Sequence, residues 1–471
     1  MIKKNDVKTG KIISIGNNGE GIIKDEDKVI FVPFALLGEV VEYKVLKVTS
    51  KCVFAKLLKV TEKSRDRVTP PCEVFCKCGG CQLQHVLYEK QLLLKKQSVE
   101  NTLKKVAFID NQVTDVVGCD NEFRYRNKLQ LPISNVDDNL AVGFYAENSH
   151  RVVEIDDCLI NADWTRGIIQ SVKQYAKEFN LKGYDQFTRK GDLREITVRE
   201  VKGNLIITLV INKKKVDGMQ RFVDILRLYL PNKFSLFVNV NTTNSNVIYG
   251  DEFYKVYGDN EYYGEMLSIK FPMSVQSFMQ VNDNICEKLY SHVEKTVNAD
   301  CQSVVIDAYS GAGLMTSILA KNAKKAIGIE IIPQAVELSN KLAESNGLKS
   351  KIVNYTGKCE EILPKVLEKE VVNGERVTVV LDPPRKGCDL SVIQSLIENN
   401  IDNVIYVSCN PATLARDLGV LTGSLVVGNN GIVKNESDKR LYKVNSITLF
   451  DMFPQTKHVE SVVCLTRRLD N

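Results

Sequence analysis

The chain has 471 residues, which is too many for one compact core and predicts two or three domains. Hydrophobic residues make up 44% and charged residues 26%, a balance typical of folded proteins that argues against disorder. No run reaches the ~18 apolar residues that a membrane helix needs, and the first residues lack the apolar segment of a secretory signal. We therefore expect a cytoplasmic protein.

The net charge of +5 is unevenly distributed. Residues 1–70 carry fourteen Lys and Arg against nine Asp and Glu, which accounts for the whole excess. A basic module on a neutral body suits a nucleic-acid partner, although a solvated basic surface explains it equally well. The thirteen cysteines are spread along a large chain, which favours reduced thiols, a metal site or catalysis over disulfides.

Three segments with different sequence patterns follow one another along the chain. Short strands and turns in residues 8–60 predict a small all-β barrel, to which we assign residues 1–62. A linker at Glu62–Pro71 precedes a helical pattern over residues 86–106. Short alternating runs in residues 123–270 predict a mixed, strand-rich central domain over residues 63–275.

From about residue 284 helices alternate with apolar strands, including SVVIDAY, KAIGIE, VTVVLD, NVIYVSC and SVVCLTRR. Such alternation is typical of a parallel, doubly wound α/β sheet, to which we assign residues 276–471. Asp307–Gly313 (DAYSGAG) links the first strand to a helix, and Glu330 ends the next strand. A carboxylate there can accept both hydroxyls of a ribose, which predicts NAD or S-adenosylmethionine. Thr316 replaces the third glycine of a pyrophosphate-binding motif, which favours S-adenosylmethionine.

Two more candidate residues follow later strands. Asp382 begins Asp-Pro-Pro-Arg after VTVVL, and Cys409 follows NVIYV in Ser-Cys-Asn-Pro. The carboxyl ends of parallel strands line the ligand crevice of open α/β sheets, so both side chains are expected there. Otherwise a lone cysteine on a strand is most often a small buried hydrophobe, and Asp382 would be an exposed acid on a stiff loop.

A cysteine at that position suits the methylation of uracil. C5 of uracil becomes nucleophilic only when a thiolate adds to C6, after which C5 can accept a methyl group from a sulfonium. The adduct must then lose its C5 proton, so a base is required. Residues 451–460 offer His458 and Glu460, and position alone does not decide between them.

Five motifs resemble the RNA m5U methyltransferases of the 23S rRNA (uracil-5)-methyltransferase type and their tRNA relatives. With an N-terminal barrel that resembles a TRAM domain, they cover nearly the whole chain. The resemblance implies a Rossmann-like class I methyltransferase domain in an α/β protein that uses S-adenosylmethionine. The motifs are Phe278-x-Gln280-x-Asn282, Asp307-x-Tyr309-x-Gly311-x-Gly313, Asp382-Pro-Pro-Arg-Lys-Gly387, Ser408-Cys409-Asn410-Pro411-x-Thr413-x-Ala415-Arg416-Asp417 and Asp451-x-Phe-Pro-x-Thr-x-His458-Val-Glu460.

The same resemblance implies a role for each motif residue. Cys409 is the implied nucleophile and Glu460 the implied general base, while Phe278 would stack on the flipped uracil and Asp382 would reach it. The central domain and the barrel would bind RNA, and the basic run at residues 124–128 suits this, unless it is an ordinary exposed strand. The residues implied to hold S-adenosylmethionine are Gln280, Tyr309, Glu330 and Asp382. The positions that depart from the family pattern are Ser310, Leu314 and Lys358, with an expected surface insertion at 421–440.

Cys72, Cys78 and Cys81 place three thiols within ten residues, and the glycine pair between the last two lets the chain wrap closely around a metal centre. Spacing alone leaves zinc and an iron-sulfur cluster equally open. The family resemblance favours a [4Fe-4S] cluster with Cys158 as the fourth ligand and Cys76 as a bystander.

Together these observations predict an enzyme that methylates C5 of a uridine in 23S rRNA. A tRNA methyltransferase acting on the T-loop is the main alternative, because the catalytic motifs are shared. A non-catalytic iron-sulfur RNA-binding protein is a second alternative, against which the intact Cys409 and Glu460 argue. No membrane or obligate protein partner is expected.

Overall fold

The computed structural model describes residues 2–25, 27–136, 139–277, 279–371, 375–428, 431–437 and 441–468. The chain forms two compact units. The first unit consists of Met1–Ser98, Asn121–Tyr262 and Phe453–Lys457, and the second consists of Val99–Asp120, Tyr263–Met452 and His458–Asn471. All thirteen cysteines lie in the described part, and none forms a disulfide.

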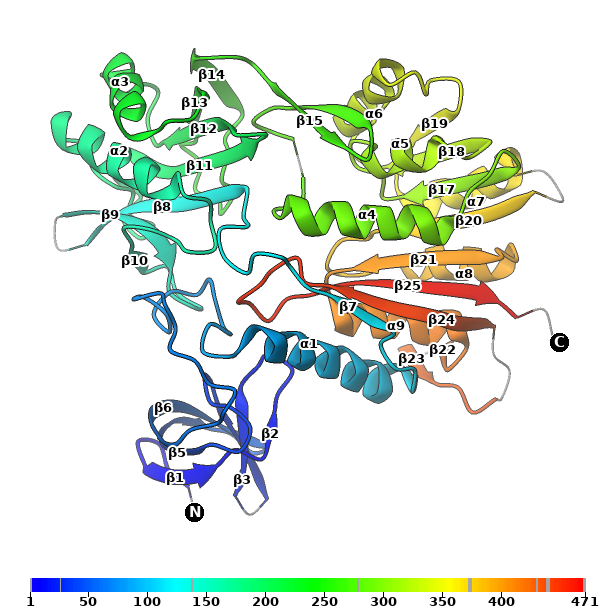
Figure 1. Cartoon of the computed structure of the whole chain (residues 1–471), viewed down its shortest axis with the longest axis horizontal. Helices are drawn as coiled ribbons and strands as arrows, with labels where there is room; N and C mark the ends of the chain where they lie inside the picture. Colours follow the sequence, from blue (N-terminus) through cyan, green and yellow to red (C-terminus); the bar gives the residue numbers. More distant parts are fainter. Residues whose placement is uncertain are drawn as a thin grey trace. The chain divides into compact units, whose positions relative to one another are not determined.

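The N-terminal part of the first unit is a six-stranded sheet with the order β1-β5-β6-β4-β3-β2 (Figure 1). Alternate residues of β5 are buried, so Val41, Tyr43 and Val45 enter the core together with Ile30. The short strands predicted for residues 8–60 are confirmed. Their bounds are β1 Val7–Lys11, β2 Ser14–Ile15, β3 Gly21–Asp25, β4 Lys28–Val32, β5 Val40–Val48 and β6 Cys52–Glu62.

The rest of the first unit is built on a seven-stranded mixed sheet with the order β10-β9-β8-β11-β12-β13-β14. Helices α2 and α3 contribute their apolar faces to its core, where Tyr175 stacks on Phe222. The strand-rich prediction for this region is confirmed. The elements are β8 Lys128–Val136, β9 Asn139–Tyr145, β10 Val152–Glu154, α2 Thr165–Glu178, β11 Leu193–Val201, β12 Asn204–Ile211, α3 Met219–Tyr229, β13 Phe234–Val240 and β14 Glu252–Tyr257.

The helix predicted for residues 86–106 is confirmed, with a different ending. Helix α1 runs over Tyr88–Thr102 and continues as a single π-helical turn, Leu103–Ala107. Phe108 ends the turn in the left-handed conformation, with φ of 56°, and donates its N–H to the carbonyl of Leu103.

The second unit is built on an eight-stranded sheet with the order β19-β18-β17-β20-β21-β25-β24-β7. The five adjacent strands β19, β18, β17, β20 and β21 are mutually parallel, as the sequence predicted. A separate hairpin of β15 and β16 belongs to the same unit. The strands are β7 Asp115–Val117, β15 Tyr262–Met266, β16 Ile269–Met273, β17 Ser303–Ala308, β18 Lys325–Glu330, β19 Ile352–Thr356, β20 Arg376–Leu381, β21 Asn403–Ser408, β24 Tyr442–Phe450 and β25 Glu460–Arg467.

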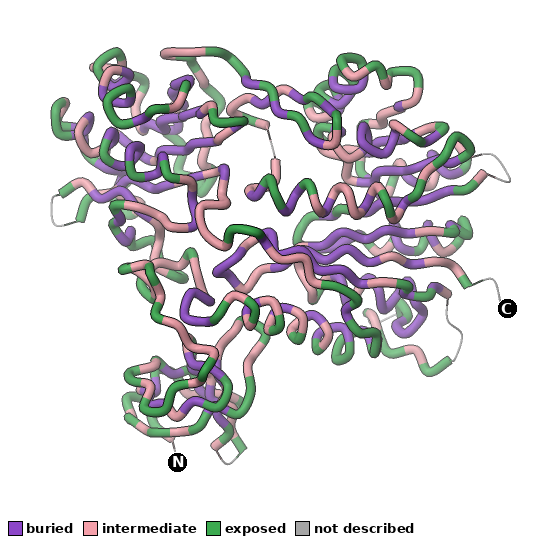
Figure 2. Tube along the Cα trace, viewed as in Figure 1, coloured by how far each residue is buried: buried purple, intermediate pink, exposed green. Residues whose placement is uncertain are grey.

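Helices cover both faces of this sheet, and its central strands are buried along their length (Figure 2). One face packs on α7, α8 and α9 through residues such as Ile306, Val379 and Tyr406. Helices α4 and α5 contact the same strands outside that core. The helices are α4 Asp283–Val297, α5 Leu314–Ala320, α6 Pro333–Ser345, α7 Cys359–Glu370, α8 Leu390–Glu398 and α9 Pro411–Thr422.

Strand β25 (Glu460–Arg467), which contains most of the segment SVVCLTRR, departs from the predicted parallel order because it runs antiparallel to both β21 and β24. The connection from β24 to β25 spans only residues 451–459, and a parallel crossover needs a dozen or more residues. The short connection therefore forces β25 to turn back beside β24.

The expected surface insertion at residues 421–440 contains a short hairpin, β22 Leu425–Gly428 paired with β23 Gly431–Lys434. Residues 429–430 and 438–440 of that segment lie outside the described residues. Across the described ranges, no helix is both long and apolar enough to span a membrane.

Candidate active site

Three predicted site residues follow neighbouring strands of the second unit at one edge of its sheet. Tyr309 follows β17, Asp382 follows β20 and Cys409 follows β21. Register brings these strand ends together, because Ala308 lies opposite Leu381 and β20 and β21 are paired in parallel. The edge is the one at which open α/β sheets bind ligands.

The antiparallel strand β25 adds Glu460 to this same edge. Ser461 lies opposite Ser408 in the antiparallel pair of β21 and β25. Glu460 comes one residue before Ser461, and Cys409 comes one residue after Ser408, so both lie at the same end of this pair. The two side chains, 51 positions apart in the sequence, therefore become neighbours. Cys409 is half-buried and Glu460 is only 4% exposed.

The acidic and basic groups at this edge influence one another strongly. Burial, followed by the negative charge of Asp382, raises the pKa of the Glu460 carboxyl group to about 8. Burial also raises the pKa of the Cys409 thiol, and the charge of Glu460 raises it further. Asp382 keeps exposed surface, yet the protein around it displaces enough water to raise its pKa to about 6. Arg385 opposes these shifts and lowers the pKa of both Glu460 and Cys409.

The glycine turn after β17 is held against the end of β18. Glu330 accepts hydrogen bonds from the backbone N–H of Gly311 (3.0 Å) and of Ile332 (2.9 Å). Gly311 has φ of 54°, and an added Cβ there would meet no atom within 4 Å. Gly313 is needed for close packing, because a Cβ would lie 2.0 Å from the hydroxyl of Ser339. The turn thus offers open backbone beside a carboxylate, which suits an adenosine-type ligand.

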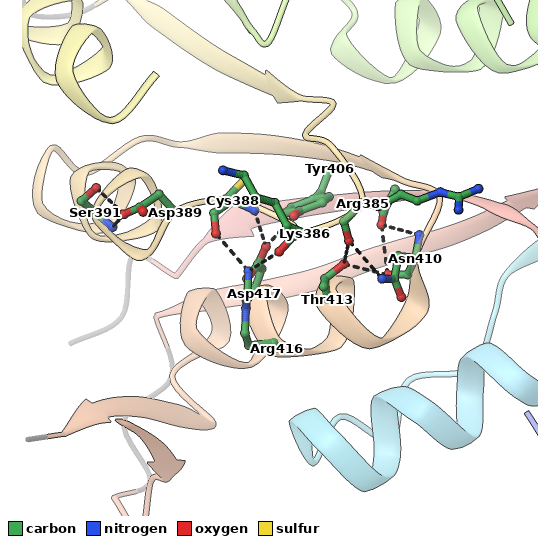
Figure 3. Close-up of polar contacts among 11 residues, drawn as sticks. Arg385, Lys386, Cys388, Asp389, Ser391, Tyr406, Asn410, Thr413, Arg416 and Asp417 are labelled. Carbon is green, nitrogen blue, oxygen red and sulfur yellow. Dashed lines mark hydrogen bonds and ion pairs between the residues drawn. The ribbon is translucent and has the colours of Figure 1, made fainter. Parts of the chain in front are cut away.

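The start of helix α9 fixes the loop that carries Asp382 and Arg385 (Figure 3). Asn410 donates its side-chain N–H to the carbonyl of Arg385 at 3.0 Å, and the hydroxyl of Thr413 donates to the same carbonyl at 3.2 Å. One turn on, the fully buried Asp417 accepts from the Tyr406 hydroxyl at 2.6 Å and from the Cys388 N–H at 2.9 Å. The two loops that carry Cys409 and Asp382 are therefore fixed to each other.

Comparison with known proteins decides the family. The sequence profile of tRNA (Uracil-5-)-methyltransferases matches residues 87–468, and the TRAM domain profile matches residues 9–58. The chain belongs to the RNA uracil-5-methyltransferase family. Its relatives include uncharacterized RNA methyltransferases of Clostridium acetobutylicum and Staphylococcus epidermidis. The first is 38% identical over 99% of this chain and 98% of its own length, and the second 34% identical over 99% of both.

A solved structure of the same family has a similar fold. It is the tRNA (uracil-54, C5)-methyltransferase of Pyrococcus abyssi in complex with S-adenosyl-L-homocysteine. It is 25% identical, with a TM-score of 0.75, and the match covers 97% of this chain and 99% of that one. The predicted α/β methyltransferase fold with an N-terminal TRAM domain is thereby confirmed.

The remaining predicted residues of this methyltransferase lie on neighbouring segments, and Phe278 lies outside the described residues. Gln280 precedes helix α4 and is half-buried. Tyr309 has φ of 71°, a conformation that costs energy for a residue with a side chain. Burial and the neighbouring thiols of Cys359 and Cys388 raise the pKa of its hydroxyl.

Two residues near this edge, Arg385 and Tyr290, had no role assigned from the sequence. Arg385 was noted only as part of a motif, although it is the cation whose charge reaches both Glu460 and Cys409. Tyr290, on helix α4, has its pKa raised well above the usual value by burial, by the neighbouring Cys286 and by the charges of Asp382 and Asp307. An arginine next to an acid in a motif was an available signal for Arg385, but nothing in the sequence pattern distinguishes Tyr290.

Part of the base motif belongs to the first unit. Phe453–Lys457 lies between β24 and β25, and within it the buried Gln455 adopts φ of 69°. Its backbone N–H donates to the side chain of Gln91 at 3.0 Å, and Gln91 donates back to its side-chain oxygen at 3.0 Å. The N–H groups of Gln82 and Leu83 donate to its carbonyl. Phe453–Lys457 is therefore held by residues of its own unit that follow Cys81.

The four predicted cluster ligands also lie in the first unit, on two loops. Burial raises the pKa of Cys78 to about 11 and that of Cys81 to about 12, and for both the charge of Cys158 contributes to the rise. The pKa of Cys72 is also raised, and the charge of Cys158 again contributes. The charge of Cys158 is not among the causes of the raised pKa of the exposed Cys76. Two sulfurs accept hydrogen bonds, Cys78 from the N–H of Gly80 at 3.3 Å and Cys158 from the side chain of Asn161 at 3.1 Å.

In the described part of the chain these thiols are not arranged as a metal site. Within the described ranges, no group of three or more His, Cys, Asp or Glu side chains is arranged to hold a metal ion.

The basic run at residues 124–128 is largely engaged within the first unit. Arg124 forms an ion pair with Asp157 at 2.7 Å and donates to the carbonyl of Cys158 at 3.1 Å. Tyr125 donates its hydroxyl to the carbonyl of Pro454 at 3.0 Å. Arg124 thus anchors the loop that carries Cys158.

Replacing Asp417 should cost the protein more stability than replacing Asp389. Asp417→Asn leaves the Arg416 guanidinium, 2.7 Å away, without its carboxylate, and should lower the free energy of unfolding by about 2–3 kcal/mol. Asp389 is exposed on the loop before α8, where its side chain caps that helix, so Asp389→Asn should cost about 1 kcal/mol or less. Urea titrations of both variants measure the difference, and equal losses would contradict this role of Asp417.

Proposed function

We propose that the protein transfers a methyl group from S-adenosylmethionine to C5 of a uridine in RNA through a covalent adduct between Cys409 and C6 of the base. The observation that carries the proposal is the arrival of Glu460 and Cys409 at one edge of the sheet from different strands. A nucleophile and a base beside each other are what the addition and elimination steps require.

The side chains at this edge divide the reaction among them. Cys409 adds to C6 as a thiolate: its electron pair forms the S–C6 bond, and the π pair of the C5–C6 double bond moves to C5, which then takes up the methyl group. Glu460 removes the C5 proton, and the electrons of that C–H bond restore the double bond and expel Cys409. Asp382 and Arg385 lie close enough to influence both groups, which suits them to orient the uracil.

The residues proposed to hold S-adenosylmethionine fit an adenosine-type ligand. Glu330 uses its carboxylate to hold the turn at Gly311, where the backbone has open space. Gln280, Tyr309 and Asp382 complete the proposed set. S-adenosylmethionine supplies the electrophilic methyl group when bound. The S-adenosyl-L-homocysteine complex of the Pyrococcus abyssi relative supports this choice of cofactor.

For the RNA we propose 23S rRNA, with the T-loop of tRNA as the second candidate. The cysteine loop together with the TRAM domain favours rRNA, whereas the solved relative is a tRNA enzyme. Incubation of the protein with tritiated S-adenosylmethionine and unmodified transcripts of each RNA decides between them. Label at C5 of uridine in 23S rRNA alone is the expected result. Label in tRNA alone transfers the proposal to tRNA, and label in neither contradicts both.

We further propose that Cys72, Cys78, Cys81 and Cys158 hold a [4Fe-4S] cluster with a structural role. The charges of these thiols influence one another, and N–H groups donate to the sulfurs of Cys78 and Cys158; both observations support the proposal. Protein purified without air should be brown, with about four iron atoms per chain. Cys81→Ser should lose the iron and Cys76→Ser should keep it. Metal analysis that finds one zinc and negligible iron would overturn the proposal.

A further inference from the structure

The first unit presents an aromatic side chain to solvent at one edge of its seven-stranded sheet. Phe187 is 86% exposed, the highest value among the large hydrophobic residues of the described ranges. Isolated apolar side chains on a surface are common, so exposure alone indicates nothing. Two further features distinguish Phe187 from an isolated apolar side chain: the hydrogen bonds of its turn and the positive charges around it.

The turn that carries Phe187 is held by hydrogen bonds among its own residues. One oxygen of the Asp185 side chain accepts from the N–H of Phe187 at 2.8 Å and from that of Thr188 at 2.7 Å. The Asp185 N–H donates to the carbonyl of Lys190, and the Arg189 N–H donates to the carbonyl of Asp185. These bonds define the turn and place Phe187 at its tip.

A second loop lies against this turn. Leu193, the first residue of β11, pairs with Ile211, the last residue of β12, so the loops beyond them lie at the same end of these two strands. The side chain of Asn212 donates to the carbonyls of Arg189 at 3.3 Å and Gly191 at 3.1 Å. The lysines that follow Asn212 are therefore placed beside the Phe187 turn.

The two loops are strongly basic. Residues 182–192 and 212–217 contain six Lys or Arg against three Asp. Asp185 is engaged by backbone N–H groups, and Asp192 forms an ion pair with Lys213 at 2.8 Å. The exposed cations are Lys182, Arg189, Lys190, Lys214 and Lys215.

We propose that this surface binds an unpaired stretch of the RNA substrate, with Phe187 stacked on a base and Arg189 and Lys190 against the flanking phosphates. An aromatic face can stack on any base, and nearby cations follow the backbone of a single strand. A lone aromatic among cations gives a protein partner little apolar area to bury. The inference rests on the proposed function and adds a site for RNA recognition beside the seven-stranded sheet of the first unit.

A tryptophan reporter tests the stacking directly. The chain contains one tryptophan, Trp164, which is 6% exposed and donates to Glu200 at 2.7 Å. Phe187→Trp adds an exposed indole whose emission should be quenched when the 23S rRNA or tRNA transcript is added. Leu228 is 71% exposed on α3 in the same unit. Leu228→Trp is the matched control, and its emission should not change.

Affinity measurements then separate stacking from charge. Phe187→Ala should weaken binding of the transcript by about 5- to 100-fold without changing its salt dependence. Phe187→Tyr should restore affinity, and Leu228→Ala should have no effect. Replacing Arg189 and Lys190 by Gln should lower the slope of log affinity against log salt by about 0.7 for each phosphate that is no longer neutralised.

Failure of this inference differs from failure of the proposed function. If the wild-type protein methylates a transcript while Phe187→Ala binds it normally and Phe187→Trp is not quenched, the inference is overturned and the function stands. Loss of affinity in Phe187→Ala with no methylation by the wild-type protein supports the surface and removes the function. A wild-type protein that binds neither transcript overturns both.

Discussion

Cys409→Ser is expected to abolish methyl transfer while leaving the protein folded and able to bind RNA. A serine hydroxyl is a far weaker nucleophile than a thiolate, so C6 is not attacked and C5 never becomes reactive. The rate should fall by at least on the order of 10⁴-fold. Release of tritium from 5-tritiated uridine in the transcript measures turnover, and a filter-binding assay measures RNA affinity.

Cys464 provides a matched control on the neighbouring strand. It is half-buried on β25, opposite Ile405, and away from the strand end that carries Glu460. Cys464→Ser should keep near-normal turnover and thermal stability. Substantial tritium release by Cys409→Ser would remove Cys409 from the nucleophile role.

Glu460→Gln is expected to stop the reaction one step later. Thiolate addition and methyl transfer precede proton loss, so only the elimination of Cys409 needs the base. The variant should accumulate a protein–RNA species that survives denaturing gel electrophoresis and carries the transferred methyl group. Mass spectrometry of the digested adduct should locate the methylated uridine on Cys409.

Two comparisons make the test specific. The double variant Cys409→Ser/Glu460→Gln should give no retarded species, because the covalent bond requires the thiol. His458→Asn should turn over without trapping RNA if His458 only orients its neighbours. Trapping by His458→Asn together with free turnover by Glu460→Gln would reverse the two assignments.

The buried position of Glu460 also predicts how pH acts. Its pKa is raised to about 8 from an ordinary value near 4.5, so the folded protein favours the neutral carboxyl group. Ionisation therefore costs the wild-type protein stability as pH rises from about 4.5 to about 8. Glu460→Gln lacks this cost, so its advantage in the free energy of unfolding should grow over that range and then level off. A constant difference in urea titrations from pH 5 to 9 would contradict the raised pKa.

Local patterns in the sequence were enough to predict the alternation of strands and helices, the helix at residues 86–106 and the residues at strand ends. These features depend on hydrophobic period and turn chemistry, which are properties of short segments. The same patterns did not reveal that Asn410, Thr413 and Asp417 fix the loop of Asp382, because those contacts join residues that are far apart in the sequence.

The sequence by itself determined the family and the candidate nucleophile, since both depend on motifs that are read along the chain. It could not decide how β25 is directed, because an apolar strand reads the same in either direction. Only the tertiary structure decided this, through a connection too short for a parallel crossover. The antiparallel direction brings Glu460, the first residue of β25, to the edge where β21 delivers Cys409, and the burial there raises its pKa. The proposed catalytic pair therefore depends on strand direction, a property of the folded sheet.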